Sequence, residues 1–329
     1  MNLNLRRGLG VSLGLSIIAI MIVIAFTFDQ DTIDNLGLIR PGFLLLALGL
    51  LLLAIAVEGG RIAFVANIMG GSVSWRQGIA IFLTTSFAAL VTPMGMGELP
   101  TLAIMYAKAG LNTGLAAAAA VARSFITKLV FLSAIIYLFG FQRSRVQFGL
   151  ITDNVFSVMA LVFFITVLVN ASYVLFPGLV TGLWRRMPQR WQRGRFARWQ
   201  NRLDFEAREF DRGINVVWRK HPLSLIIIGL MSGAYWTLYF GILPVLSRGL
   251  GVLVDPVLLV SRQFVLTLAL PFIPLPGGSG ALELAMVAAY QGLIPRAFIS
   301  IFVLSWRLFT FYLLVLLGAL AALRNLWRK

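Results

Sequence analysis

The chain has 329 residues, of which 59% are apolar and 12% charged, and its mean hydropathy is +0.90. A soluble domain cannot bury that much apolar surface, so the bilayer is the expected solvent. The net charge is +16, with Arg residues concentrated near the N-terminus, in one central loop and in the tail, which suits anionic lipid better than nucleic acid. The same distribution of charge leads us to expect no nucleic-acid partner. The sequence has no Cys and a single His, His221, so we also expect no metal and no cofactor.

Eight apolar segments are predicted to be transmembrane helices. They comprise residues 9–28, 41–68, 77–92, 112–139, 153–176, 222–249, 252–272 and 296–323. The first follows Arg6 and Arg7 but lacks an A-x-A cleavage site, so we interpret it as a retained span. The fold class is therefore all-α, a polytopic integral membrane protein, with one membrane domain over residues 1–329.

Two further segments are interrupted by Pro and Gly. The first motif, residues 92–100, reads T-P-M-G-M-G-E-L-P, and the second motif, residues 274–283, reads P-L-P-G-G-S-G-A-L-E; each precedes a short apolar run. Equivalent residues are 183 to 185 positions apart, namely Pro93 and Pro276, Glu98 and Glu283, and Arg123 and Arg307. A constant offset indicates an internal repeat, with repeat one at about 1–140 and repeat two at about 150–329.

Charge predicts the topology. The loop at 29–40 carries three Asp, whereas the basic loop at 177–221 carries eleven Lys or Arg against four acids. By the positive-inside rule the basic loop and both termini are cytoplasmic, in a multi-pass protein of the inner membrane. We favour an odd number of crossings in each half, with the broken segments as fifth crossings, which makes the repeats inverted. The alternative is that both are re-entrant hairpins, which leaves the basic loop on the wrong side or requires another helix to break.

The basic loop also contains an amphipathic stretch. Between Arg198 and Trp218, the apolar residues Leu203, Phe210 and Ile214 fall on one side of a helix and the charged residues on the other. We expect a helix in the headgroup layer, with a solvated loop as the alternative.

The two motifs are the candidate site. A half-helix that begins near the midplane presents unpaired N–H groups and the positive end of its dipole, which suits an anion, and inverted repeats bring two such ends together. Tight helix packing is the alternative role for the glycines. The candidate substrate-binding residues of the motifs are Pro93, Gly95, Gly97, Glu98, Pro276, Gly277, Gly278, Gly280 and Glu283.

Charged residues within apolar helices extend this site. Arg123 and Arg307 each follow a motif, and a buried guanidinium can bind phosphate in a bidentate way or pair with Glu98 or Glu283. Both Arg residues are included among the substrate-binding candidates. Glu58 and Arg61, spaced i, i+3, can form a structural ion pair on one helix face.

The paired motifs, together with Arg123 and Arg307, resemble the flippase-like family that shares the transmembrane domain of lysylphosphatidylglycerol synthases, the multiple peptide resistance factors. The resemblance covers nearly the whole chain and implies a membrane domain associated with translocation of aminoacylated phospholipid. This chain ends at Lys329, without the cytoplasmic synthase part, so aminoacyl transfer is not carried over.

Three functions compete. The leading one is a lipid transporter or flippase that binds an anionic phospholipid or lipid-linked headgroup at a midplane site. The others are a membrane-embedded transferase acting on a lipid and a non-catalytic subunit that presents lipid to a partner. No soluble-enzyme motif such as a P-loop, G-x-S-x-G or H-E-x-x-H is present, which favours a protein that is not an enzyme. Membrane lipids are the expected partners, with a lipid-synthesis enzyme and a second copy of the chain left open.

Overall fold

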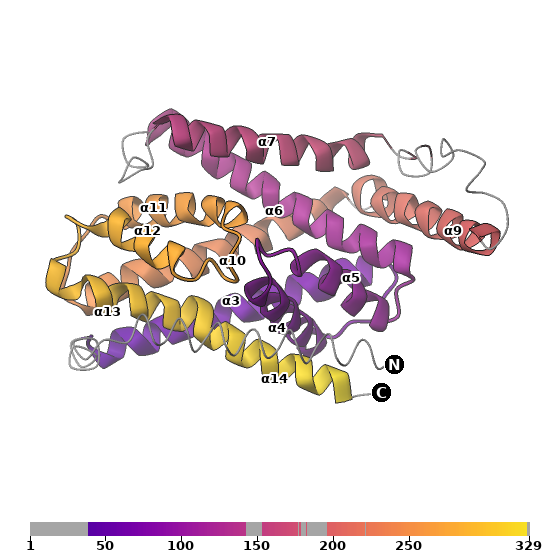
Figure 1. Ribbon diagram of the computed structural model, residues 1–329. Coiled ribbons are helices and arrows are strands. Elements are labelled where there is room, and N and C mark those ends of the chain that lie inside the picture. The colour runs from indigo at the N-terminus through magenta and orange to yellow at the C-terminus, as the bar shows by residue number, and fades with distance from the viewer. Residues whose placement is uncertain are drawn as a thin grey trace.

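The computed structural model describes residues 39–142, 153–176, 178, 182, 196–220 and 222–327. The regular elements in these ranges are helices (Figure 1), which confirms the all-α prediction. They are α3 (Pro41–Ile68), α4 (Trp75–Val91), α5 (Glu98–Lys108), α6 (Thr113–Phe141), α7 (Asp153–Leu175), α9 (Phe196–Asn215), α10 (Pro222–Gly249), α11 (Pro256–Ala269), α12 (Ala281–Tyr290), α13 (Arg296–Arg307) and α14 (Leu313–Trp327). The predicted span at 9–28 lies outside the described residues.

Within the described residues, five helical stretches are long and apolar enough to cross a membrane. They are α3, α6, α7, α10 and the stretch Arg296–Arg324, in which a π-helical turn at Leu308–Tyr312 joins α13 to α14. The spans predicted at 77–92 and 252–272 are shorter helices in the structure: α4 has 17 residues and α11 has 14. Both are shorter than the roughly 20 helical residues that typically cross about 30 Å of hydrocarbon.

The centre of the fold is the antiparallel helix pair α3 and α10. The backbone N–H of Arg40, just before α3, donates to the carbonyl of Gly249 at the end of α10, at 3.1 Å. Farther along the pair, the side chain of Leu50 lies beside Gly241. The two helices occupy equivalent places in the two repeats, so the antiparallel pairing gives the repeats opposite directions.

The first motif turns the chain back instead of carrying it across the membrane. α4 begins with a capping box, in which Ser74 Oγ accepts from the backbone of Gln77 while the Gln77 side chain accepts from the backbone of Ser74. After the motif, α5 returns to the end of α3, where the hydroxyl of Tyr106 donates to the carbonyl of Ile62 at 3.3 Å. The predicted crossing is therefore wrong, and α4 with α5 forms a re-entrant hairpin (Figure 1).

The second motif forms a matching hairpin from the opposite end of the molecule. α11 begins beside the end of α10, and the Asp255 side chain caps it by accepting from the backbone N–H of Val257 at 2.9 Å. α12 then returns, and the hydroxyl of Tyr290 at its end donates to the carbonyl of Leu259 near the start of α11, at 2.8 Å. Two hairpins that enter from opposite ends replace the two crossings predicted from charge and parity (Figure 1).

The predicted amphipathic helix of the basic loop is α9, which packs across the first turns of α6. Two of its carboxylates bind there: Glu206 Oε2 accepts from the backbone N–H of Gly114 at 2.5 Å, and Glu209 Oε2 accepts from Asn112 Nδ2 at 2.9 Å. Its apolar side buries Ile214 against the helices. Carboxylates at a helix N-terminus offset its positive dipole end, so α9 fixes the start of α6. A location of α9 in the headgroup layer stays a prediction.

Candidate functional site

The two motifs meet at the tips of the hairpins. Pro93 and Pro276 pair in an antiparallel backbone bridge. Both tips make the same turn: Gly95 N donates to the Thr92 carbonyl at 3.3 Å, and, 183 residues later, Gly278 N donates to the Leu275 carbonyl at 3.0 Å. The repeat seen in the sequence is therefore also a repeat of backbone structure, and its two copies touch.

The turns require left-handed backbone conformations, which L-residues with a side chain rarely adopt. Gly95 and Gly278 have φ of +69° and +66°. The preceding position has φ of +58° in Gly277 and +56° in Met94. Met94 is thus a strained residue at a position where the second repeat has glycine.

The motif residues divide into those that face a cavity and those that support the turn. A cavity of about 270 Å³, the central cavity, lies between the two tips and the helices α10, α11 and α13. Gly95, Glu98, Gly277 and Gly278 line it, together with Arg307. The remaining candidates are not among its lining residues: Pro93, Gly97, Arg123, Pro276, Gly280 and Glu283.

The backbone N–H groups at the start of α5 are less available than the sequence suggests. Gly97 N donates to Thr92 Oγ1 at 2.8 Å, and Glu98 N donates to the Gly95 carbonyl at 3.1 Å. The expectation that free N–H groups of the first half-helix form the anion site is wrong for these two donors. The charged side chains, rather than these N–H groups, are the polar groups that the first motif offers to a ligand.

Arg123 belongs to a buried ionic network. Its Nε and Nη2 lie 2.8 and 2.5 Å from Glu58 Oε1, and its Nη1 lies 3.0 Å from Glu98 Oε1. Arg61 Nη2 binds the same Glu58 oxygen at 2.7 Å, and Arg61 Nη1 donates to Thr127 Oγ1 at 2.8 Å. Two guanidinium groups and two carboxylates thus balance in charge, as buried charges require. The sequence indicated the pairs of Glu58 with Arg61 and of Arg123 with Glu98, but not the bond from Arg123 to Glu58.

Arg307 repeats the ion pair with fewer partners. Its Nε lies 2.8 Å from Glu283 Oε1, and its Nη1 donates to the Gly277 carbonyl at 3.1 Å. The residue as a whole is 2% exposed, and its guanidinium carbon lies 5.1 Å from the ring centre of Phe311. Its Nη2 has no hydrogen-bond acceptor within the described part of the chain. Because a buried donor without an acceptor is costly, an acceptor brought within reach of Nη2 would stabilise it.

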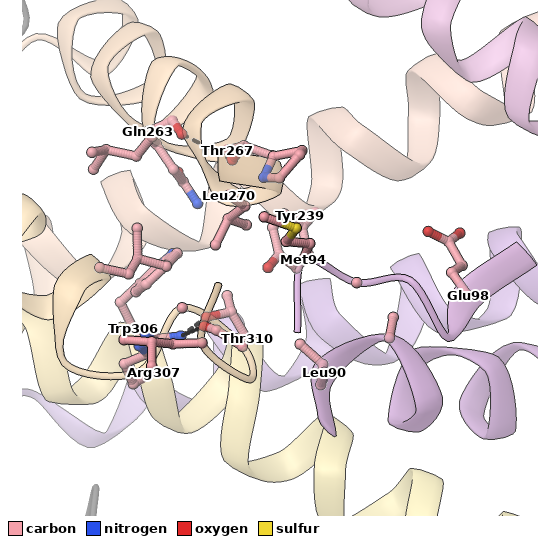
Figure 2. A pocket seen from close by; sticks show the side chains of 18 of the residues that line it. Leu90, Met94, Glu98, Tyr239, Gln263, Thr267, Leu270, Trp306, Arg307 and Thr310 are labelled. Carbon is pink, nitrogen blue, oxygen red and sulfur yellow. Dashed lines mark hydrogen bonds between the residues drawn. The ribbon is translucent and has the colours of Figure 1, made fainter. Parts of the chain in front are cut away.

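The orientation of the ion pair is opposite in the two repeats. In the first, Glu98 faces the central cavity with a 46% exposed side chain, while Arg123 lies behind it. In the second, Arg307 faces the cavity and Glu283, with an 11% exposed side chain, lies behind. Figure 2 shows Arg307 on one side of the cavity and Glu98 on the other. The cavity therefore presents one cation and one carboxylate.

Several polar residues of the cavity were missed in the sequence because each is an isolated polar position within an apolar helix. They are Tyr239, Gln263, Thr267 and Thr310 (Figure 2). Gln263 is 1% exposed, and in the amide orientation that satisfies its neighbours its oxygen accepts from Trp306 Nε1 at 2.8 Å. A buried amide in an apolar helix was the one available signal. By contrast, Arg262 lies outside the cavity and donates to the carbonyl of Ala289.

Paired re-entrant hairpins around a charged internal cavity define this molecule as a polytopic helical membrane protein of the kind that builds a site from two inverted repeats. The chain belongs to the family described as the lysylphosphatidylglycerol synthase TM region, whose model matches residues 10–318. It is also similar to a UPF0104 membrane protein of Archaeoglobus fulgidus, with 22% identity over 274 residues, covering 79% of this chain and 80% of the relative. No solved structure matches the chain. The resemblance stated from the motifs is thereby confirmed, and the family indicates a lipid-related membrane function.

Proposed function

We propose that the chain binds the phosphate of an anionic lipid headgroup in the central cavity and moves that lipid between the two leaflets. Arg307 carries the proposal, because its guanidinium is buried, faces the cavity and has an unpartnered Nη2. A planar guanidinium suits bidentate binding of phosphate oxygens. The apolar lining residues Leu270 and Leu282 would contact the adjoining parts of the lipid.

The arrangement of the hairpins supports transport rather than binding alone. The two hairpins enter from opposite ends of the molecule (Figure 1), and residues of both tips line the cavity. Alternate rocking of two inverted repeats around a fixed site would open the cavity first to one leaflet and then to the other. Separation of the bridge between Pro93 and Pro276 is the movement that this mechanism requires.

A transferase finds less support in the cavity. A transferase needs a general base beside the acceptor, and the one carboxylate among the lining residues is Glu98, whose Oε1 is already bound to Arg123 at 3.0 Å. A lipid-presenting subunit would use the same headgroup contact without flipping. Reconstitution in vesicles with fluorescent phosphatidylglycerol separates these functions, since transport alone makes inner-leaflet probe accessible to an external quencher.

The test of the site compares Arg307, which lines the cavity, with Arg262, which does not. Arg307→Lys keeps the charge but loses the planar fork, so the affinity for phosphatidylglycerol in nanodiscs should fall by about 2 kcal/mol, roughly thirtyfold in Kd. Arg262→Lys, at an Arg of the membrane helices that lies outside the cavity, is the control and should leave Kd unchanged. Full binding by Arg307→Lys at matched folded protein would exclude bidentate recognition.

We also propose that the end of the molecule carrying α9 is cytoplasmic, because the basic loop at 177–221 is attached there. The chain has no Cys, so single-Cys variants report orientation directly. An impermeant maleimide applied to intact cells should label Arg296→Cys at the start of α13 and leave Arg212→Cys on α9 unlabelled. The reverse pattern would invert the proposed orientation.

A further inference from the structure

A second hollow, larger than the central cavity, lies on the side of the helix bundle. It has a volume of about 610 Å³ and is lined by residues 130–138 of α6, 233–248 of α10 and 256–264 of α11, and we call it the lateral groove. Most of its lining side chains are apolar, including Phe131, Leu138 and Val260. An apolar hollow on a membrane protein must be filled, since empty apolar space forfeits dispersion contacts.

The groove is longer than one leaflet of the hydrocarbon core. Along α10 it extends from Gly233 to Arg248, which at 1.5 Å per residue is roughly 22 Å. Half of a hydrocarbon core of about 30 Å is only about 15 Å. A groove of this length can therefore hold an extended acyl chain from the headgroup level to beyond the midplane.

The two ends of the groove differ in chemistry. At one end is Arg248, in the last turn of α10, with an exposed side chain. Within the described residues its guanidinium makes no hydrogen bond or ion pair, so the charge is available to a ligand. Near the other end is Trp236, which also lines the central cavity and thus forms a wall shared by the two hollows. The groove therefore leads from a cation at the end of the bundle to the central site.

Glycine keeps this groove open. Gly233 lines it, and a Cβ added there would have no atom within 4 Å. Gly241 also lines the groove, and an added Cβ would make only ordinary contact with Leu50. Neither glycine is required by a positive φ, so the space above them belongs to the groove and not to a tight backbone turn.

We propose that the lateral groove is a second lipid site, in which an acyl chain of an anionic phospholipid lies between α6, α10 and α11 and its phosphate is bound by Arg248. The occupant is a lipid because the groove combines an apolar channel with one terminal cation, which matches an acyl chain joined to a phosphate. This site is separate from the central cavity and does not depend on Arg307.

The test uses phosphatidylglycerol with a photoreactive diazirine at the end of one acyl chain, incorporated into nanodiscs with the full chain. Cross-linked peptides identified by mass spectrometry should fall on residues 130–138 and 233–241. Gly233→Leu fills the groove and should reduce this yield at least threefold, whereas Gly49→Leu, at an exposed glycine of α3 with equally open surroundings, should not.

The headgroup contact is tested separately. Arg248→Gln should lower the affinity of the groove for phosphatidylglycerol roughly fivefold, the effect of one basic side chain at an anionic membrane surface, and leave phosphatidylcholine unaffected. Arg296→Gln, at another exposed Arg outside the groove, is the control. Arg307→Gln should leave groove cross-linking intact, which distinguishes this site from the central one.

Three results would overturn the proposal. One is cross-links spread evenly over all lipid-facing helices, and another is an unchanged yield in Gly233→Leu. The third is a cross-link from a photoreactive residue at position 134 to peptide 9–28, because this would mean that the first apolar segment of the chain fills the groove.

Discussion

In the first repeat Arg123 is bound by two carboxylates, Glu58 and Glu98, whereas in the second repeat Arg307 has only Glu283 and a backbone carbonyl. The helices α3 and α10 begin 181 residues apart, at Pro41 and Pro222, so the position equivalent to Glu58 in the second repeat is Tyr239, which carries no carboxylate. A single extra acid thus satisfies one Arg within the protein and leaves the other with an unused donor.

This difference teaches how a symmetric fold can make an asymmetric site. The same motif, the same turn and the same ion pair occur in both halves, yet the member that lines the central cavity is the acid in one and the Arg in the other. A headgroup that enters such a cavity meets a cation and an anion on different walls. Each prediction below tests one part of this difference between the two halves.

The largest effect is expected from Glu58→Gln. Glu58 is fully buried and binds both Arg61 and Arg123, so its loss leaves two buried cations with one carboxylate, Glu98. The cost should be about 3–5 kcal/mol, measured as thermal unfolding in detergent. Glu98→Gln is the control: because its side chain is 46% exposed and Arg123 keeps Glu58, we expect about 1 kcal/mol. Equal losses would show that Glu58 has no special role.

The two arginines should respond differently to lysine. Arg123 uses three guanidinium nitrogens to join Glu58 and Glu98, which one ammonium group cannot reproduce, so Arg123→Lys should lower stability by about 2–3 kcal/mol. The folded fraction should keep its affinity for phosphatidylglycerol. Arg307→Lys should show the converse, with weaker lipid binding and a smaller loss of stability. If both variants lose binding equally, the division between a structural and a ligand-binding Arg is wrong.

A smaller contrast is expected between two glycines of the tips. In Gly277→Ala the new methyl group would meet the ring of Phe311 and also occupy a positive φ, which should cost about 2 kcal/mol. Gly95→Ala has the positive φ alone, with open space around it, and should cost about 1 kcal/mol. Chemical denaturation in mixed micelles measures both, and an equal cost would mean that Phe311 moves away freely.

The smallest effect, and the one stabilising change, is Met94→Gly. Met94 has the left-handed conformation that Gly277 has in the second repeat, so glycine should relieve strain by up to about 1 kcal/mol. The Met94 side chain also lines the central cavity, and its removal should enlarge the space for a ligand. A loss of stability would show that packing of this side chain outweighs the backbone strain.

Much of the fold follows from local sequence. The ranges predicted at 41–68 and 222–249 coincide with α3 and α10, because Pro begins each helix and a long apolar run follows. The repeat was visible because each motif needs Gly and Pro at fixed places to form its turn. The pair of Glu98 with Arg123 and the pair of Glu283 with Arg307 were among the predicted alternatives.

The direction of the broken segments could not be predicted in the same way. Hydropathy reports how favourably a segment enters lipid, and α4 and α11 are apolar whether they cross or stop halfway. Charge parity alone did not decide between the two arrangements. In each hairpin, two full crossings and a turn back halfway both return the chain to the side from which it came. The basic loop therefore stays opposite the acidic loop in either case. The contact between Pro93 and Pro276 settles it by placing both turns inside the bundle.

The sequence by itself determined a helical membrane protein, its two repeats and the pairs of Glu and Arg, because apolar length, turn chemistry and charge in lipid are local properties of the chain. Only the tertiary structure decided that the hairpins return, that Glu58 reaches Arg123 across 65 residues, and that Arg307 rather than Arg123 faces the cavity. Those features depend on which helices become neighbours. The physical reason is that a buried charge is satisfied by whatever acceptor the packing brings within about 3 Å, wherever that acceptor lies in the sequence.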